Sequence, residues 1–192
     1  LKSIDKGKTW INVGLNDSHH VSRIIINPNN PDQVIIGVIG HLYSSNEERG
    51  IFKTSDGGKT WAKTLYINQD TGIIDVAHAP ENFDIIYAAS WERSREAWNF
   101  KGNGSNSAIY KSTDAGESWT KITDKSGFPS GSGVGRIGLA VFNKNTVYAL
   151  HDSQFRRPKN KNKKPSDELT KEDFKTMSSN DFLKLTNKKL NT

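Results

Sequence analysis

Short apolar runs, each followed by a polar turn, dominate the chain between residues 20 and 152. One representative unit, residues 22–67, contains four such runs: SRIIIN, QVIIGVI, GIFKTS and KTWAKTLYI. The runs are rich in Ile, Val, Thr and aromatic residues, and Pro, Asn, Asp and Gly separate them, which is typical of β-strands joined by turns. Because no long helical pattern lies between the runs, the sequence predicts antiparallel strands and an all-β fold.

The strand pattern repeats along the chain. Residues 26–40 align with residues 78–92 at an offset of 52, which places Pro28 on Pro80 and Asp32 on Asp84. A third copy begins within residues 134–150. Four antiparallel strands in a repeat of roughly 50 residues are typical of one blade of a β-propeller.

A shorter motif lies between the third and fourth runs of each unit. Its pattern, (S/T)-x-D-x-G-x-(S/T)-W, occurs without a gap at residues 3–10, 54–61 and 112–119. Three of the five tryptophans occupy its last position, so chance is a poor explanation. The residues that carry the pattern are Ser3, Asp5, Gly7 and Trp10, then Thr54, Asp56, Gly58 and Trp61, then Ser112, Asp114, Gly116 and Trp119.

The three motifs resemble Asp boxes, or BNR repeats, which occur in sialidases, in sortilin-type (Vps10) propellers and in xyloglucan-active propeller hydrolases. Residues 1–152 are similar to bacterial proteins described as sortilin-like or as BNR-repeat glycosyl hydrolases, particularly from the Bacteroidetes. The resemblance implies that each box is the turn between the third and fourth strands of a blade. The Asp would accept hydrogen bonds from the turn, the Gly would adopt a left-handed conformation, and the Trp would pack between neighbouring sheets. We therefore expect Asp5, Asp56 and Asp114 to be structural and not catalytic.

The repeats divide the chain into a propeller segment, residues 1–152, and a tail, residues 153–192. The segment provides about three blades, whereas closed propellers need roughly four to eight. We therefore expect a partial propeller whose remaining blades belong to the same polypeptide. In the tail, Thr170 with Asp173 and Ser178 with Asp181 indicate the starts of two short helices. The tail is either an insertion within the fourth blade or a linker beyond it, and it either docks on the propeller or binds a partner.

The net charge of +6 is located in this tail. Residues 154–192 hold eleven Lys and Arg against five Asp and Glu, and the rest of the chain is neutral. We therefore expect no nucleic-acid partner for the folded part. The chain lacks cysteine, its longest apolar run (residues 34–39) is too short to span a bilayer, and we expect any export signal to lie outside it.

The first candidate binding site is the loop between the second and third strands of the second whole blade. This repeat carries six additional residues within residues 93–106, and in propellers such loops lie on the face opposite the boxes. Aromatic and arginine side chains gather there: Trp91, Arg93, Arg95 and Trp98. They suit stacking on sugar rings or contacts with peptide side chains, and a loop that only packs on its neighbour is the alternative.

The second candidate site consists of Arg23, Asp75 and Arg136. These residues occupy one position in three successive repeats, at offsets of 52 and 61, near the start of the innermost strand. We expect them to lie around the top of the central channel. They form either a structural ionic ring or a site for a carboxylate ligand.

The sequence favours an extracytoplasmic, non-catalytic propeller module that binds protein or peptide or scaffolds a cell-envelope assembly. The alternative is a glycan-binding or glycoside-hydrolysing propeller, which would need two carboxylates facing each other across a cleft. A sialidase-like arginine triad is not evident, because Asp75 stands where the third arginine would be. The histidines show no metal-ligand spacing, so we expect no metal and no cofactor.

Overall fold

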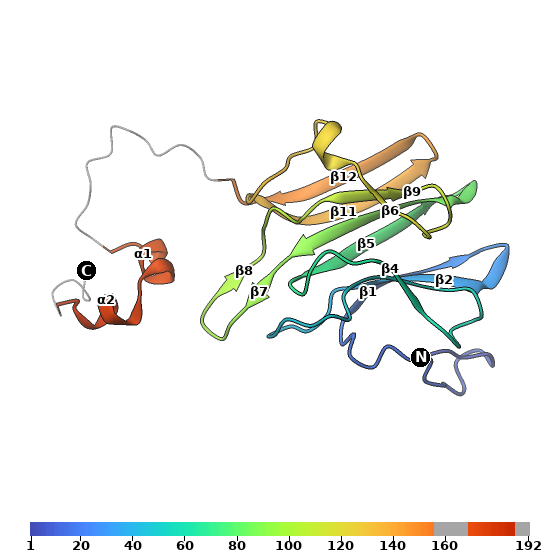
Figure 1. Ribbon diagram of the computed structural model, residues 1–192, viewed down its shortest axis with the longest axis horizontal. Helices are drawn as coiled ribbons and strands as arrows, with labels where there is room; N and C mark the ends of the chain where they lie inside the picture. The colour runs from blue at the N-terminus through green and yellow to red at the C-terminus, as the bar shows by residue number, and fades with distance from the viewer. Residues whose placement is uncertain (156–168, 187–192) are drawn as a thin grey trace. The chain divides into compact units, whose positions relative to one another are not determined.

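The structure is a computed structural model that describes residues 1–155 and 169–186 (Figure 1). The chain divides into two compact units, residues 1–155 and residues 156–192. The regular secondary structure of the first unit is almost entirely antiparallel β-strand, as the sequence predicts. The described part of the second unit contains two short helices.

Two four-stranded antiparallel sheets form the body of the first unit, and each follows the order of one predicted repeat. The first sheet has the order β1-β2-β3-β4, and the second has the order β5-β6-β9-β10. Their strands are β1 (Val21–Asn27), β2 (Asn30–Val38), β3 (Gly50–Thr54), β4 (Ala62–Leu65), β5 (Thr71–Ala79), β6 (Asn82–Glu92), β9 (Ile109–Ser112) and β10 (Thr120–Lys121).

Smaller elements complete this unit. A third sheet pairs two long strands, a separate two-stranded hairpin follows β6, and a short 3-10 helix follows β10. These elements are β11 (Val134–Asn143) with β12 (Thr146–Ser153), β7 (Ser94–Arg95) with β8 (Phe100–Lys101), and η1 (Thr123–Lys125). The first box closes with a single bridge between Lys2 and Ile11.

The three larger sheets lie side by side, with β5 between β1 and β11 (Figure 1). One apolar cluster joins the first and second sheets through Ile35, Ile51 and Ile73. A second cluster joins the second sheet to the third through Ile74, Tyr87 and Ile137. Because neighbouring residues of a strand point to opposite faces, Ile73 belongs to the first cluster and Ile74 to the second. The central sheet is therefore buried on both faces.

The three boxes fold into the same turn. In each, the Ser or Thr hydroxyl donates to the Asp Oδ1 at 2.7–2.8 Å, and the Gly N–H donates to that hydroxyl at 2.8–2.9 Å. The glycines have φ between 81° and 92°, which is the left-handed conformation that the pattern predicts. Hydrogen bonds from Thr9 and Ser118 lower the pKa of Asp5 and Asp114 to about 2. These carboxylates hold the turn together.

The box tryptophans link neighbouring sheets, with one exception. The Trp61 indole donates to the Val13 carbonyl at 2.7 Å, and the Trp119 indole donates to Thr64 Oγ1 on β4 at 3.2 Å. Trp10 instead donates to the Gly7 carbonyl within its own turn and is 59% exposed.

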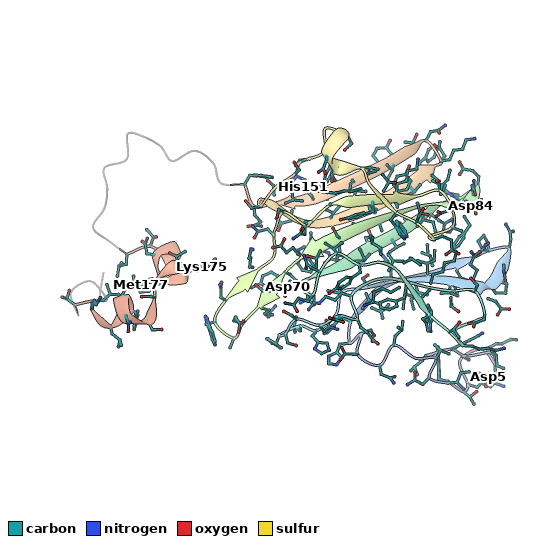
Figure 2. All side chains as sticks on the ribbon, viewed as in Figure 1. Asp5, Asp70, Asp84, His151, Lys175 and Met177 are labelled. Carbon is teal, nitrogen blue, oxygen red and sulfur yellow. The ribbon has the colours of Figure 1, made fainter. Side chains whose placement is uncertain are left out.

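The boxes and the long loops lie at opposite ends of the sheets. Each whole-blade box touches the turn of its own inner hairpin, since Gly57 N–H donates to the Asp32 carbonyl and Ala115 N–H to the Asp84 carbonyl. Figure 2 shows Asp5 and Asp84 at this end and Asp70 at the other. We call the first end the box face. The other end, formed by residues 15–20, 39–49, 66–70 and 91–107, is the loop face.

The two predicted helices begin where the sequence places them. Thr170 caps α1 (Lys171–Thr176) with a capping box to Asp173, and Ser178 caps α2 (Ser179–Leu183) by accepting the Asp181 N–H. Phe174 and Phe182 contact each other edge to face, with ring centroids 6.4 Å apart. The basic stretch between residues 156 and 165 lies outside the described residues.

Candidate binding face

A buried arginine organises the first loop of the loop face, residues 39–49. The Arg49 side chain is 2% exposed, and its guanidinium donates to the carbonyls of Ile39, His41 and Ser44 at 2.8–3.1 Å and to Asn46 Oδ1 at 2.8 Å. Burial lowers the pKa of Arg49 from its ordinary value. One cation therefore fixes the backbone of a loop that has no regular secondary structure.

The additional residues of the second blade form the β7–β8 hairpin. Glu96 and Asn99 exchange backbone hydrogen bonds at 2.7 and 3.3 Å, which leaves Ala97 and Trp98 as a two-residue turn at its tip. Trp98 is 84% exposed. The Arg95 guanidinium lies over the Phe100 ring, 5.4 Å from the centroid, and Phe100 meets Trp91 edge to face. The hairpin, labelled β7 and β8 in Figure 1, thus presents aromatic and cationic side chains to solvent.

The residues at the base of the hairpin hold it in place. The Trp91 indole donates to the Gly102 carbonyl at 2.8 Å, and Arg93, which is 7% exposed, donates to the His41 carbonyl of the preceding blade at 3.3 Å. Glu92 accepts hydrogen bonds from the backbone and side chain of Asn106 and pairs with Lys101 at 3.3 Å. Of the four candidate ligand residues in this loop, Arg95 and Trp98 face solvent, whereas Arg93 positions the loop.

Two members of the Arg23, Asp75 and Arg136 set form an ion pair. Arg23 Nε donates to Asp75 Oδ1 at 2.8 Å, and Asp75 Oδ2 accepts the Leu139 N–H of β11 at 2.8 Å. Asp75 thus ties the innermost strands of three sheets together. Arg136 is exposed, and within residues 1–155 and 169–186 its side chain makes no hydrogen bond or ion pair.

The strand register explains why Arg136 stands apart. Arg23 lies opposite Gly37 and Asp75 lies opposite Ala89, an offset of 52 on both strands. The residue opposite Leu150, at the further offset of 61, is Gly138. Arg136 therefore precedes the equivalent position by two residues. The turn region of the β5–β6 hairpin is longer than that of the β11–β12 hairpin. The offset that aligns β6 with β12 therefore does not align β5 with β11.

The loop face also contains a cluster that sequence spacing did not reveal. Asp17, His19 and His41 bring one carboxylate and two imidazoles together, with candidate ligand atoms all within 4.8 Å of one another. His41 Nε2 lies 2.9 Å from Asp17 Oδ1, and the two imidazole rings stack with centroids 3.8 Å apart. The sequence gives one signal for this cluster. The segment that holds Asp17 and His19 and the segment that holds His41 are both loop-face connections of neighbouring repeats.

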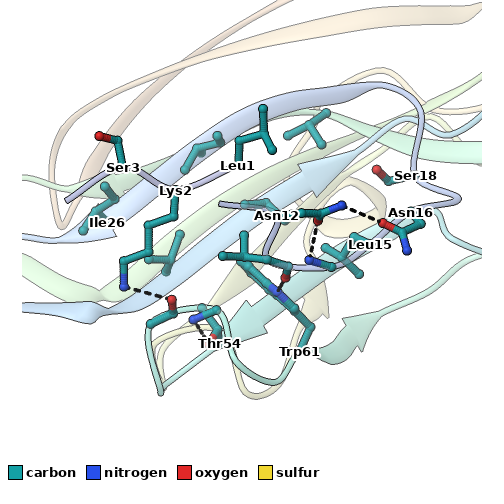
Figure 3. Close-up of a pocket in the computed structure, with 18 of the residues that line it drawn as sticks. Leu1, Lys2, Ser3, Asn12, Leu15, Asn16, Ser18, Ile26, Thr54 and Trp61 are labelled. Atoms are coloured by element: carbon teal, nitrogen blue, oxygen red, sulfur yellow. Dashed lines mark hydrogen bonds between the residues drawn. The ribbon is translucent and has the colours of Figure 1, made fainter. Parts of the chain in front are cut away.

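An apolar cleft lies between residues 1–18 and the first sheet (Figure 3). Its volume is about 620 Å³. The lining includes Val21, Ile24 and Ile26 of β1, Leu15 of the preceding segment and the box residue Trp61. Ile24 is 62% exposed, which is unusual for an aliphatic residue in the middle of a strand.

Comparison with known proteins decides the family. The family model described as Sortilin, neurotensin receptor 3 (Sortilin-Vps10) matches residues 1–191. The chain belongs to this family. Its repeating four-stranded sheets are therefore blades of the Asp-box β-propeller that the sequence predicts.

The comparisons with curated proteins and with solved structures are less informative than the family match. No curated protein matches the chain. Among solved structures, the chain is similar to an ancestral GH74 enzyme, with 22% identity and a TM-score of 0.47 over 67% of this chain. The match covers 16% of that enzyme, so this chain spans a small part of its length. A likeness at this level says nothing about activity.

Proposed function

We propose that the chain is part of an extracytoplasmic β-propeller that binds a protein or peptide partner through its loop face, without catalysis. The observation that carries the proposal is the β7–β8 hairpin, whose tip exposes Trp98 beside Arg95 and Phe100. Trp and Arg are the residue types most enriched in binding hot spots. A Trp side chain has only two rotatable side-chain bonds, so it loses little conformational entropy when it binds.

Two candidate carboxylates, Asp75 and Glu92, have structural contacts, which favours binding over hydrolysis at these two residues. A glycosidase needs two carboxyl groups that face the substrate across a cleft. Asp75 accepts from Arg23 and from two backbone N–H groups, and Glu92 accepts from Asn106 and Lys101. Both carboxylates therefore already have structural partners.

We further propose that these blades belong to a larger propeller that contains additional blades of the same polypeptide. Support comes from apolar side chains on the two outer sheets of the first unit. Ile24 on β1 and Leu150 on β12 are 62% and 81% exposed, whereas the central sheet is buried on both faces. Extracytoplasmic localisation is proposed from the family. Among the described residues no helix is long and apolar enough to cross a membrane.

The binding proposal can be tested by selecting peptide ligands from a displayed library with the whole chain and measuring their affinity by calorimetry. Trp98→Ala and Arg95→Ala should each weaken binding by about 2 kcal/mol, the size of a true hot spot. Lys59→Ala is the matched control, because Lys59 is an exposed residue of the box face. Equal affinities for all three variants would contradict the proposal.

The exposed indole of Trp98 also suits stacking on a sugar ring. A glycan array and a glycoside hydrolysis assay with the same variants therefore serve as the second arm. If the chain binds a glycan but no peptide, and Trp98→Ala abolishes that binding, the protein is lectin-like and the proposed function is wrong. If the chain hydrolyses a glycoside and Trp98→Ala abolishes the hydrolysis, the protein is a glycosidase.

A further inference from the structure

Asp17, His19 and His41 have no part in the proposed binding by the β7–β8 hairpin. Asp17 and His19 lie on the connection that leads into β1, and His41 lies on the loop after β2. Their side chains meet on the loop face, with His41 Nε2 and Asp17 Oδ1 2.9 Å apart and all candidate ligand atoms within 4.8 Å. Asp17 and His19 are exposed and His41 is half-buried, so the cluster is accessible from solvent.

Outer hydrogen bonds orient two of the three side chains. His41 Nδ1 lies 2.8 Å from Ser44 Oγ, which leaves Nε2 directed at Asp17. Asp17 Oδ2 accepts from Asn46 Nδ2 at 3.3 Å, and its backbone carbonyl accepts from the same amide at 2.8 Å. Metal-binding histidines and carboxylates usually have outer partners of this kind, which fix the ring and the carboxylate before the ion arrives.

The buried Arg49 also fixes the loop of residues 39–49, which carries His41. It donates to the backbone carbonyls of His41 and Ser44 and to the side chain of Asn46. The residues that orient the cluster are therefore held by a side chain that solvent does not reach. Supported positioning of this kind is what a preorganised site requires.

We propose that Asp17, His19 and His41 form a binding site for a transition-metal dication, Zn²⁺ above all. Two imidazoles and one carboxylate are a ligand set that suits Zn²⁺ and does not suit Mg²⁺ or Ca²⁺, which prefer oxygen ligands. Bonds of about 2.0–2.2 Å in a tetrahedral site bring ligand atoms to about 3.3 Å from one another. The exposed His19 ring, which stacks on His41, has to leave this stack and turn a ring nitrogen toward the ion. Three protein ligands leave the fourth position open to water.

The test is a calorimetric titration of the whole chain with ZnCl₂, together with the visible absorption of bound Co²⁺. We expect saturable binding of one ion per chain and a tetrahedral Co²⁺ spectrum. His19→Ala, His41→Ala and Asp17→Asn should each weaken Zn²⁺ binding at least tenfold, and excess MgCl₂ should not compete. His78→Ala is the control, because this histidine contacts Ala79 and Phe83 and lies outside the cluster.

His19→Ala is the most informative variant, because the His19 ring is exposed and stacks on His41 at the surface, so its removal should leave the fold intact. Circular dichroism of each variant confirms folding. Absence of saturable Zn²⁺ binding by the wild-type chain would overturn the proposal. Binding that His19→Ala and His41→Ala leave unchanged, or that His78→Ala abolishes, would overturn it as well.

Discussion

The box face and the loop face of the same sheets are built in different ways. At the box face, three turns repeat one set of hydrogen bonds, all within a stretch of eight residues. At the loop face the two whole blades share no common structure. One blade has a loop held by the buried Arg49, and the other has the projecting β7–β8 hairpin. The box face thus repeats one local turn in every blade, whereas the structure of the loop face differs from blade to blade.

The largest expected effect concerns Arg49. Arg49→Met should lower the free energy of unfolding by about 3 kcal/mol or more, because four partly buried acceptors lose the same buried donor at once. Chemical denaturation monitored by fluorescence measures the change. Arg95→Met, an exposed arginine of the same face, is the control and should change stability by less than about 0.5 kcal/mol. A similar small change in Arg49→Met would show that the loop face needs no such support.

Tryptophans of the two faces provide a direct contrast. Trp119→Ala should cost about 2–3 kcal/mol, since its half-buried indole packs on the cluster between the sheets and bonds Thr64. Trp98→Ala should change the stability by less than about 0.5 kcal/mol, because the side chain is exposed. Thermal and urea denaturation of the two variants would compare them. A lower melting temperature for Trp98→Ala would make the hairpin a packing element.

A box glycine tests the turn geometry. Gly58→Val should destabilise its blade by roughly 1–3 kcal/mol, the cost of a strained backbone position. Gly58 has φ +92°, and a Cβ there would lie 3.1 Å from Val13 Cβ of the preceding repeat. Gly127→Val is a useful companion, because Gly127 has φ +75° with no neighbour within 4 Å. Urea denaturation measures the loss of stability in each variant. The difference between the two losses gives the cost of the contact between Gly58 and Val13 of the preceding repeat.

The smallest effect is expected from pH. The pKa of Asp5 and Asp114 is lowered from 3.8 to about 2 by hydrogen bonds within each box, and that of Asp56 is lowered by the same kind of bonds. A lowered folded-state pKa stabilises the fold above the unfolded value, and this stabilisation disappears as pH falls from about 4 to about 2. Asp5→Asn with Asp114→Asn should flatten the decline in that window. An unchanged slope would assign acid unfolding to other groups.

The sequence predicted much more of the box face than of the loop face. The all-β fold, the box turns and both helix starts are confirmed, and the family follows from the boxes. For the loop face, the sequence located the additional residues of the second blade but not which of them face solvent. The division of the propeller segment from the tail at residue 152, the larger propeller and the ligand-binding roles remain predictions.

What the sequence determined by itself is local. A box turn forms because a hydroxyl, a carboxylate and a glycine lie within a few residues, and a helix start forms because Thr170 and Asp173 are three residues apart. Only the tertiary structure decided that Arg49 is buried, that Arg136 lies two residues from the Asp75 position, and that His41 meets Asp17. These outcomes depend on strand register and on contacts between residues far apart in the chain. The repeat offset brought Arg23 and Asp75 together correctly, but spacing alone does not specify strand register or which loops meet.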